Sequence, residues 1–299
     1  MKFKISPVFF LAAAIFILWT ACDEIDEPIV IVSEQYSTDG YLDTLYYVDS
    51  VSITTKQVLL EDFTGHKCVN CPEAALAAQD LAESLDNRLV IYSVHAGYYA
   101  EPDASGYYTA DYRCPVSEQL YNDFQAFANP IGLINRVVYN GSRLVGAGNW
   151  ETVVMQELTK PNRTELTVRN IYYPNLGKVQ TDVYIRFLLP EEDKFTLVMF
   201  IAEAGIVSPQ KNNNPAIGPS PDWLDYEHHN ILRGFLNAVY GGYFTEDGTV
   251  NQNEDYHSQF IFTPDTTWVT ANCRIMSYIL NETSGEVYQV AEAGIKVSE

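Results

Sequence analysis

The sequence is poor in basic residues, with 18 Lys and Arg against 39 Asp and Glu in 299 residues and a formal net charge of −21. Nucleic-acid binding needs clustered Lys and Arg that neutralise phosphates. Docking on anionic lipid headgroups needs a basic surface as well. The scarcity of positive charge therefore excludes nucleic acid as a partner and argues against electrostatic attachment to a membrane surface.

The sequence also lacks an apolar run that could cross a bilayer as a helix. The run from Val8 to Trp19 has twelve residues, whereas a spanning helix needs about 20. Lys2 and Lys4 precede this run, and small residues follow it up to Cys22, which is the order of a secretion signal. Residues 1–21 are therefore predicted to be a signal peptide that is removed on export.

Several catalytic motifs are missing too. The sequence has no serine nucleophile elbow, glycine-rich phosphate loop or zincin motif. A structural zinc site needs about four ligands, and only His66 stands close in sequence to Cys68 and Cys71, so we expect no metal and no cofactor. Aromatic residues make up 13% of the chain, which excludes a disordered protein because there is ample apolar surface to bury.

Two patterns divide the rest of the chain. Residues 56–161 begin with a strand, a helix and a second strand within about forty residues, which predicts a parallel βαβ unit. Residues 162–299 show short alternating strands separated by turn residues, which predict an antiparallel β-sandwich domain. The expected fold class is therefore α/β plus all-β. The expected strands are 57–63, 88–94, 133–139, 142–145, 165–173, 180–188, 196–204, 257–262, 272–280 and 287–292, the helices 72–85, 116–127 and 149–160, and the irregular segments 96–114 and 208–223.

Cys68 and Cys71 form a CxxC motif between the first expected strand and the first expected helix. This position favours thiol–disulfide exchange, because a helix N-terminus stabilises a thiolate and the two-residue spacing lets the second thiol resolve a mixed disulfide. A structural disulfide is the alternative, since proteins outside the cytoplasm meet no reducing thiol pool. Cys114 and Cys273 are left over and could pair with each other or stay unpaired.

The surroundings of the motif resemble the thioredoxin superfamily. Asp62 and Phe63 lie ahead of the CxxC as the buried aspartate and its following phenylalanine do in that superfamily, and Pro130 stands in the place of its cis-proline. The resemblance implies a thioredoxin-like domain with a helical and loop insertion. In that domain the attacking thiol would be Cys68, the resolving thiol Cys71, the proton acceptor Asp62, and the contact to the substrate backbone Pro130.

The segment around Cys22 resembles the lipobox of bacterial lipoproteins, in which the cysteine is acylated and becomes the first mature residue. An ordinary signal peptide with an incidental cysteine is the alternative. Residues 22–55 hold eight acidic residues and no basic one, which predicts a solvated tether. Acidic residues directly after Cys22 resemble the surface-export signal of Bacteroidetes lipoproteins. That resemblance implies a lipid anchor on the outer face of the outer membrane, with the periplasmic face as the alternative.

A wider resemblance covers nearly the whole chain. Its segments are Phe63-Thr64-Gly65 before the CxxC, Val94-His95-Ala96-Gly97, Asn135-Arg136, His229-Asn230-Ile231-Leu232-Arg233 and Asn272-Cys273-Arg274. In these segments the sequence resembles the twenty-eight-kilodalton outer-membrane lipoprotein family of Bacteroidetes. The resemblance implies a lipid anchor, a thioredoxin-like domain and a C-terminal β domain, and it implies no particular reaction.

Five tyrosines crowd the segment 96–114, namely Tyr98, Tyr99, Tyr107, Tyr108 and Tyr112. Tyrosine-rich loops suit the recognition of peptides or glycans, although the loop could instead pack its own rings against the protein. Two functional hypotheses follow. The chain is a surface binding or adhesion protein for protein or glycan ligands, with the thioredoxin-like fold as scaffold. Alternatively, it is a thiol–disulfide oxidoreductase that acts on envelope proteins through Cys68 and Cys71.

Overall fold

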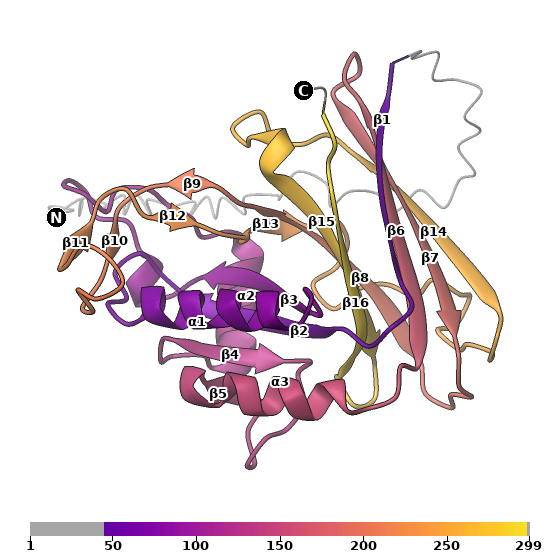
Figure 1. The fold of residues 1–299 in the computed structure, drawn as a ribbon. Coiled ribbons are helices and arrows are strands. Elements are labelled where there is room, and N and C mark those ends of the chain that lie inside the picture. The colour runs from indigo at the N-terminus through magenta and orange to yellow at the C-terminus, as the bar shows by residue number, and fades with distance from the viewer. Residues whose placement is uncertain (1–44, 298–299) are drawn as a thin grey trace, which may run out of the picture.

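The computed structural model describes residues 45–297. The predicted signal peptide, the predicted lipidation site Cys22 and the start of the predicted tether lie outside the described residues. The described part is a mixed α/β protein in which strands dominate and helices are few (Figure 1). Its strands form one sheet of eight strands, one of four and two of two strands each.

The eight-stranded sheet has the order β16-β15-β8-β13-β3-β2-β4-β5. β2 and β3 are parallel neighbours joined by the helix α1, which confirms the predicted βαβ unit. β4 runs antiparallel to β2, and β5 antiparallel to β4. The bounds are β2 (Val58–Thr64), β3 (Leu89–His95), β4 (Ile131–Ile134), β5 (Leu144–Gly146), β8 (Phe195–Glu203), β13 (Ile231–Phe235), β15 (Cys273–Asn281), β16 (Val287–Gly294) and α1 (Cys71–Ser84).

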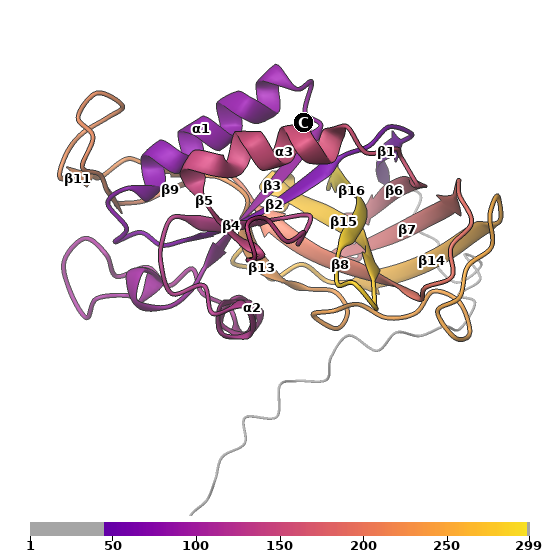
Figure 2. The same cartoon turned by 90° about the horizontal axis from the view of Figure 1, so that it is seen from below.

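Helices cover both faces of this sheet around β2. α1 buries Ala74, Ala78 and Ala82, which recur every four residues and so form one apolar stripe. That stripe packs together with Trp150 of α3 (Trp150–Leu158) on one face, whereas Leu120 of α2 (Pro115–Phe124) belongs to the core on the other face. Figure 2 shows α1 and α3 on one side of the sheet and α2 on the opposite side.

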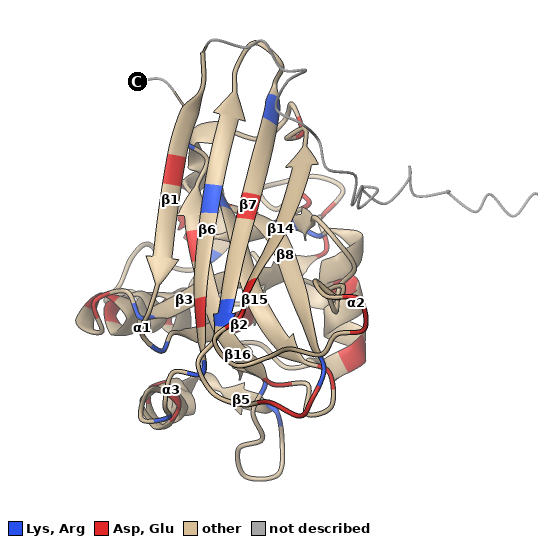
Figure 3. Ribbon diagram, turned by 90° about the vertical axis from the view of Figure 1, so that its right-hand side faces the viewer, with Lys and Arg blue, Asp and Glu red and all other residues tan. Residues whose placement is uncertain are grey.

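A second, antiparallel sheet has the order β1-β6-β7-β14. Its inward residues, such as Leu166 and Val183, share a core with Met199 of β8 and Ile275 of β15, so this sheet packs on the C-terminal part of the large one. Acidic and basic residues lie along its strands in Figure 3. The bounds are β1 (Tyr47–Ile53), β6 (Thr164–Tyr173), β7 (Lys178–Phe187) and β14 (Asp255–Phe262).

Strand β1 corrects the predicted tether, which had been extended to residue 55. Residues 47–53 pair along their whole length with β6, and the carboxylate of Asp49 accepts a hydrogen bond from the backbone N–H of Gly294 at 2.9 Å. Asp49, the acidic residue of this strand, lies on the same face as Val51 and Ile53, which pack against the core, and its hydrogen bond to Gly294 accommodates the charge there. The folded part therefore begins by Tyr47.

Strand β13 joins the two halves of the chain. It lies between β3, to which it is parallel, and β8, to which it is antiparallel. The large sheet therefore runs across the boundary predicted near residue 161, because it contains strands from both halves of the chain. Within residues 45–297, no helix is long and apolar enough to span a membrane.

Two short strand pairings hold the proline-rich segment, residues 208–223, one just outside it and one within its two ends. β9 (Ile206–Val207) pairs with β12 (Glu227–His228), and β10 (Gln210–Lys211) pairs with β11 (Asp222–Trp223). The segment is otherwise without regular structure, as predicted. Short 3₁₀ helices lie at Tyr98–Ala100, Ala147–Asn149 and Thr270–Asn272.

Candidate functional site

The CxxC motif lies where β2 leads into α1. Cys68 and Cys71 form a disulfide with their Cα atoms 5.4 Å apart, and Cys71 is the first residue of α1. Each cysteine is only 2% exposed. The two sulfur atoms are thus cross-linked and enclosed at the N-terminus of the helix.

The proline-rich segment covers the motif from one side. The side-chain amide of Gln210 donates hydrogen bonds to the carbonyl oxygens of Cys68 at 2.9 Å and Gly65 at 3.3 Å. The backbone N–H of Lys211 donates to the carbonyl oxygen of His66 at 2.8 Å. Because Gln210 is buried, these bonds hold the segment against the backbone of the motif.

The insertion, residues 96–114, covers the motif from another side. The backbone N–H of Lys67 donates to the carbonyl oxygen of Tyr99 at 3.0 Å. A Cβ atom added to Gly65 would lie 2.4 Å from the backbone carbon of Tyr99, so only glycine permits this close approach. The CxxC is therefore enclosed by two segments that come from opposite halves of the chain.

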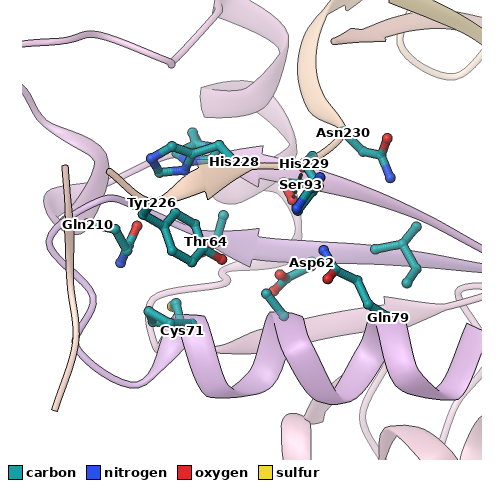
Figure 4. A pocket seen from close by; sticks show the side chains of 14 residues that line it. Asp62, Thr64, Cys71, Gln79, Ser93, Gln210, Tyr226, His228, His229 and Asn230 are labelled. Atoms are coloured by element: carbon teal, nitrogen blue, oxygen red, sulfur yellow. Dashed lines mark hydrogen bonds between the residues drawn. The ribbon is translucent and has the colours of Figure 1, made fainter. Parts of the chain in front are cut away.

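A small polar cavity of about 40 Å³ lies behind the disulfide, beside Cys71. Figure 4 shows Asp62 on β2, Cys71 on α1 and His228 on β12 directed toward this space. Three buried atoms of its lining, Asp62 Oδ1, His95 Nδ1 and His228 Nε2, have no hydrogen-bond partner among the described residues. Since a water molecule needs about 10–15 Å³, the cavity has room for about three waters that could bond these atoms.

Asp62 is the most perturbed acid of the site. Its side chain is 2% exposed, and burial raises the pKa of its carboxyl group to about 7. Burial without a partner disfavours the charged form of a carboxylic acid. Asp62 and Cys71 line the same cavity, whereas Pro130, which follows a cis peptide bond and is half-buried, is not among the lining residues.

Three histidines converge on the ring of Tyr112. The ring centroids of His66, His95 and His228 lie 6.1, 5.4 and 5.2 Å from that of Tyr112. Burial lowers the pKa of all three imidazoles, that of His228 to about 3. They are therefore neutral at pH 7 and form an aromatic cluster rather than a positively charged surface.

The five tyrosines of the insertion divide into two groups. Tyr98, Tyr99 and Tyr107 are 71%, 39% and 58% exposed, whereas Tyr108 and Tyr112 are 6% and 8% exposed. The hydroxyl of Tyr108 donates to Oδ1 of Asp222 at 2.5 Å. The exposed members are placed to contact a ligand, and the buried members tie the insertion to the histidines and to the proline-rich segment.

This division predicts opposite effects of two matched substitutions. We expect Tyr112→Ala to lower the free energy of unfolding by about 2–3 kcal/mol, because it leaves a cavity among three buried rings. Tyr98→Ala removes an exposed ring and should change it by less than about 0.5 kcal/mol. Urea denaturation of both variants checks this, and equal effects would contradict the assigned packing of the insertion.

The other two cysteines within residues 45–297 are unpaired. Cys114 is half-buried at the start of α2, and Cys273 is fully buried in β15. The disulfide between them that the sequence left open is therefore absent, and Cys273 is a small buried core residue. Among residues 45–297, no group of three or more His, Cys, Asp or Glu side chains has the geometry of a metal site.

Solved structures from Porphyromonas gingivalis are among those that match the chain. HBP35 of Porphyromonas gingivalis has a similar fold, with a TM-score of 0.57 and 14% identity over 82% of this chain and 77% of that one. A domain of the outer membrane lipoprotein Omp28 from the same organism gives a TM-score of 0.29 and 16% identity over 46% of this chain and 91% of the domain. No curated protein matches the chain.

The family described as outer membrane protein Omp28 matches residues 117–299, which is more than half of the sequence. This match confirms the family resemblance drawn from the sequence motifs. The chain belongs to the Omp28 family of outer membrane proteins.

Proposed function

We propose that the protein is a lipoprotein anchored through Cys22 at the cell surface, where it binds a ligand, and that the Cys68–Cys71 disulfide stabilises its scaffold. The burial of both sulfur atoms beneath two covering segments carries this proposal. A thiolate must approach a substrate disulfide directly during exchange. Enclosed sulfur atoms instead fit a permanent cross-link in an oxidising compartment.

We further propose that residues 56–161 are a thioredoxin-like unit. The strand order β3-β2-β4-β5, with β3 parallel and β4 antiparallel to β2, supports this proposal. The placement of α1 and α3 on one face and α2 on the other supports it as well (Figure 2). In this unit the exposed rings of Tyr98, Tyr99 and Tyr107 are the proposed ligand contacts.

The experiment is the reduction of the disulfide in the folded protein. We expect Cys68 and Cys71 to stay oxidised in glutathione buffers between roughly −270 and −120 mV, the range of known exchange catalysts. Gln210→Ala should speed reduction by dithiothreitol about 10- to 100-fold, because it removes hydrogen bonds worth about 1 kcal/mol each that hold the proline-rich segment. Alkylation followed by mass spectrometry reports the thiols.

Gln252→Ala is the matched control for Gln210→Ala. Its side-chain amide also donates to a backbone carbonyl, that of Leu188 at 2.9 Å, but on an exposed loop. Its reduction rate should equal that of the unaltered protein. Rapid reduction of the unaltered protein by glutathione would instead overturn the scaffold proposal.

One observation favours thiol–disulfide exchange as a second candidate function. Asp62 lines the cavity beside Cys71 and has a pKa of about 7, which suits a group that accepts and returns a proton near neutral pH. Exchange would then need the proline-rich segment to open. A reduction potential within the range of exchange catalysts, together with substrates trapped by Cys71→Ser, would make this candidate the function.

A further inference from the structure

A larger cavity lies away from the disulfide, between the two halves of the chain. Its volume is about 560 Å³, within the usual range for small-molecule sites of roughly 300–1,000 Å³. The lining residues come from the end of α2, the connection between β4 and β5, the loop 240–243, and the ends of β8 and β15. We call it the arginine pocket, after Arg136 and Arg143, which line it.

Arg136 forms a fixed part of this lining. It is 1% exposed, and its Nε and Nη2 atoms donate to the carboxylate of Glu61 and the hydroxyl of Tyr278. Its Nη1 donates to no group within residues 45–297. A guanidinium held in one position therefore has hydrogen-bond donors left over at a cavity.

Arg143 adds a second guanidinium. Its Nη1 and Nη2 atoms donate to the carbonyl oxygens of Arg136 and Ser284, and its Nε donates to no described group. No carboxylate lies within ion-pair distance of Arg143 in the part of the chain that the structure describes. Its positive charge is thus unpaired, unlike that of Arg136, which Glu61 balances.

Aromatic rings form the sides of the pocket. Phe124, Tyr240 and Tyr243 line it, and the two tyrosines are 39% and 43% exposed. Their hydroxyls donate to the carboxylates of Asp123 and Glu282 at 2.6 Å each. These bonds fix the rings and engage the two nearby acidic groups. The guanidinium of Arg136 lies over the ring of Tyr240 and the ammonium of Lys194 over that of Tyr243, so the exposed remainder of each ring and the spare arginine N–H groups are left for a ligand.

We propose that the arginine pocket binds a small carboxylic acid that carries a ring. A carboxylate matches the unfilled arginine donors better than a neutral acceptor does, because such hydrogen bonds are charge-assisted and can be bidentate. The ring of the ligand stacks on the tyrosines. A sugar acid and an aromatic acid both have this chemistry. The pocket is a second ligand site, apart from the exposed tyrosines of the insertion, so this inference goes beyond the proposed function.

The test uses four probes on the full chain purified in detergent, with calorimetry and ligand-observed NMR as readouts. Glucuronate is compared with glucose, and phenylacetate with 2-phenylethanol. We expect at least one acid to bind ten times or more tightly than its neutral counterpart, and the pair that shows this preference identifies the source of the ring. Equal or absent binding within both pairs overturns the proposal.

Two variants locate the binding. Arg143→Met should abolish the preference for the acid, and Tyr243→Ala should weaken binding of the acid about tenfold. Tyr184→Ala, which removes a ring of matched exposure, 44%, from β7, should change nothing. If Arg143→Met does not fold, Tyr243→Ala decides, and unchanged binding in it overturns the proposal.

The pocket proposal and the scaffold proposal can be rejected independently of each other. The arginine pocket shares no lining residue with the cavity beside Cys71. If none of the four probes shows the expected binding, the pocket proposal is rejected. The scaffold proposal is unaffected, because it is tested by reduction of the disulfide. Rapid reduction by glutathione removes the scaffold proposal, whereas acid binding that depends on Arg143 would still establish the pocket.

Discussion

Replacing Glu61 by Gln should lower the free energy of unfolding by about 3–5 kcal/mol, because it leaves the guanidinium of Arg136 buried without a counter-charge. Glu61 is 0% and Arg136 1% exposed. Nε of Arg136 donates to Oε1 of Glu61 at 2.6 Å, and Nη2 donates to Oε2 at 3.0 Å. A loss of this size is a large share of the roughly 5–15 kcal/mol by which domains are stable.

The pair also belongs to a network that joins the halves of the chain. The hydroxyl of Tyr92 donates to Glu61 at 2.6 Å, and Nη2 of Arg136 donates to the hydroxyl of Tyr278 at 2.8 Å. Tyr92 lies on β3 and Tyr278 on β15. Loss of the carboxylate therefore disturbs both the first half and the C-terminal strands, and we expect a single cooperative transition at lower urea concentration.

An exposed pair of similar geometry provides the control. Nε and Nη2 of Arg186 donate to the two carboxylate oxygens of Asp255 at 2.6 and 2.5 Å, but both side chains face solvent. Arg186→Gln should leave the urea midpoint unchanged. A double variant, Glu61→Leu with Arg136→Met, should recover at least half of the loss caused by Glu61→Gln. An equal loss of unfolding free energy in Glu61→Gln and Arg186→Gln would contradict the claim that the buried pair stabilises the fold.

Local sequence patterns predicted the first half of the fold well. Apolar residues at helical spacing identify α1, and the strands that flank it are β2 and β3. The position of Cys68 and Cys71 at the start of α1 followed from the same patterns. These features depend on contacts between residues close in sequence, which periodicity records.

Pairings between distant residues could not be predicted in this way. β13 is short, contains Gly234, and meets β3 through the single pair Ile231 and Ser93, so no pattern identified it as the link between the halves. The pairing of Glu61 with Arg136 connects residues 75 positions apart. A sequence shows that both are charged and gives no sign that the two meet.

The enclosure of the CxxC was missed for the same reason. Gln210 lies in a segment without periodicity, 142 positions from the carbonyl of Cys68 to which it donates. The approach of His228 to His95, with ring centroids 5.6 Å apart, likewise depends on the pairing of β12 with β9. The CxxC motif predicted that Cys68 and Cys71 form a disulfide. Whether the two sulfur atoms are exposed to solvent is determined by segments far from the motif in sequence.

The second large effect concerns Asp62, whose replacement by Asn should stabilise the protein at neutral and alkaline pH. The pKa of Asp62 is about 7 in the folded protein and 3.8 without the influence of the fold. Each unit of difference corresponds to about 1.4 kcal/mol, so ionisation of this buried carboxyl costs up to about 4 kcal/mol of stability. Asn cannot ionise and keeps the size of the side chain.

The sign of the pH dependence follows from proton binding. Between pH 3.8 and about 7 the folded protein holds a proton on Asp62 that the unfolded chain has released, so stability falls as pH rises through this window. The buried histidines act in the opposite direction. Below pH 6.5 the unfolded chain protonates His95 and His228 while the fold keeps them neutral, so stability falls as pH falls.

Comparing Asp62→Asn with the unaltered protein at each pH removes the contribution of the histidines, which both chains share. The difference in unfolding free energy should be near zero at pH 4, grow up to pH 7 and stay constant above it. Asp182 is the matched control: it is also buried, at 3% exposure, but accepts hydrogen bonds from Gln180 and Gln259 at 3.0 and 2.9 Å. Asp182→Asn should therefore destabilise the protein at pH 7.

A stabilisation by Asp62→Asn that is the same at pH 4 and pH 8 would contradict the prediction, because it would show that the carboxyl group of Asp62 is not protonated in the folded protein. Asp62 would then also lose its proposed role as the proton acceptor beside Cys71.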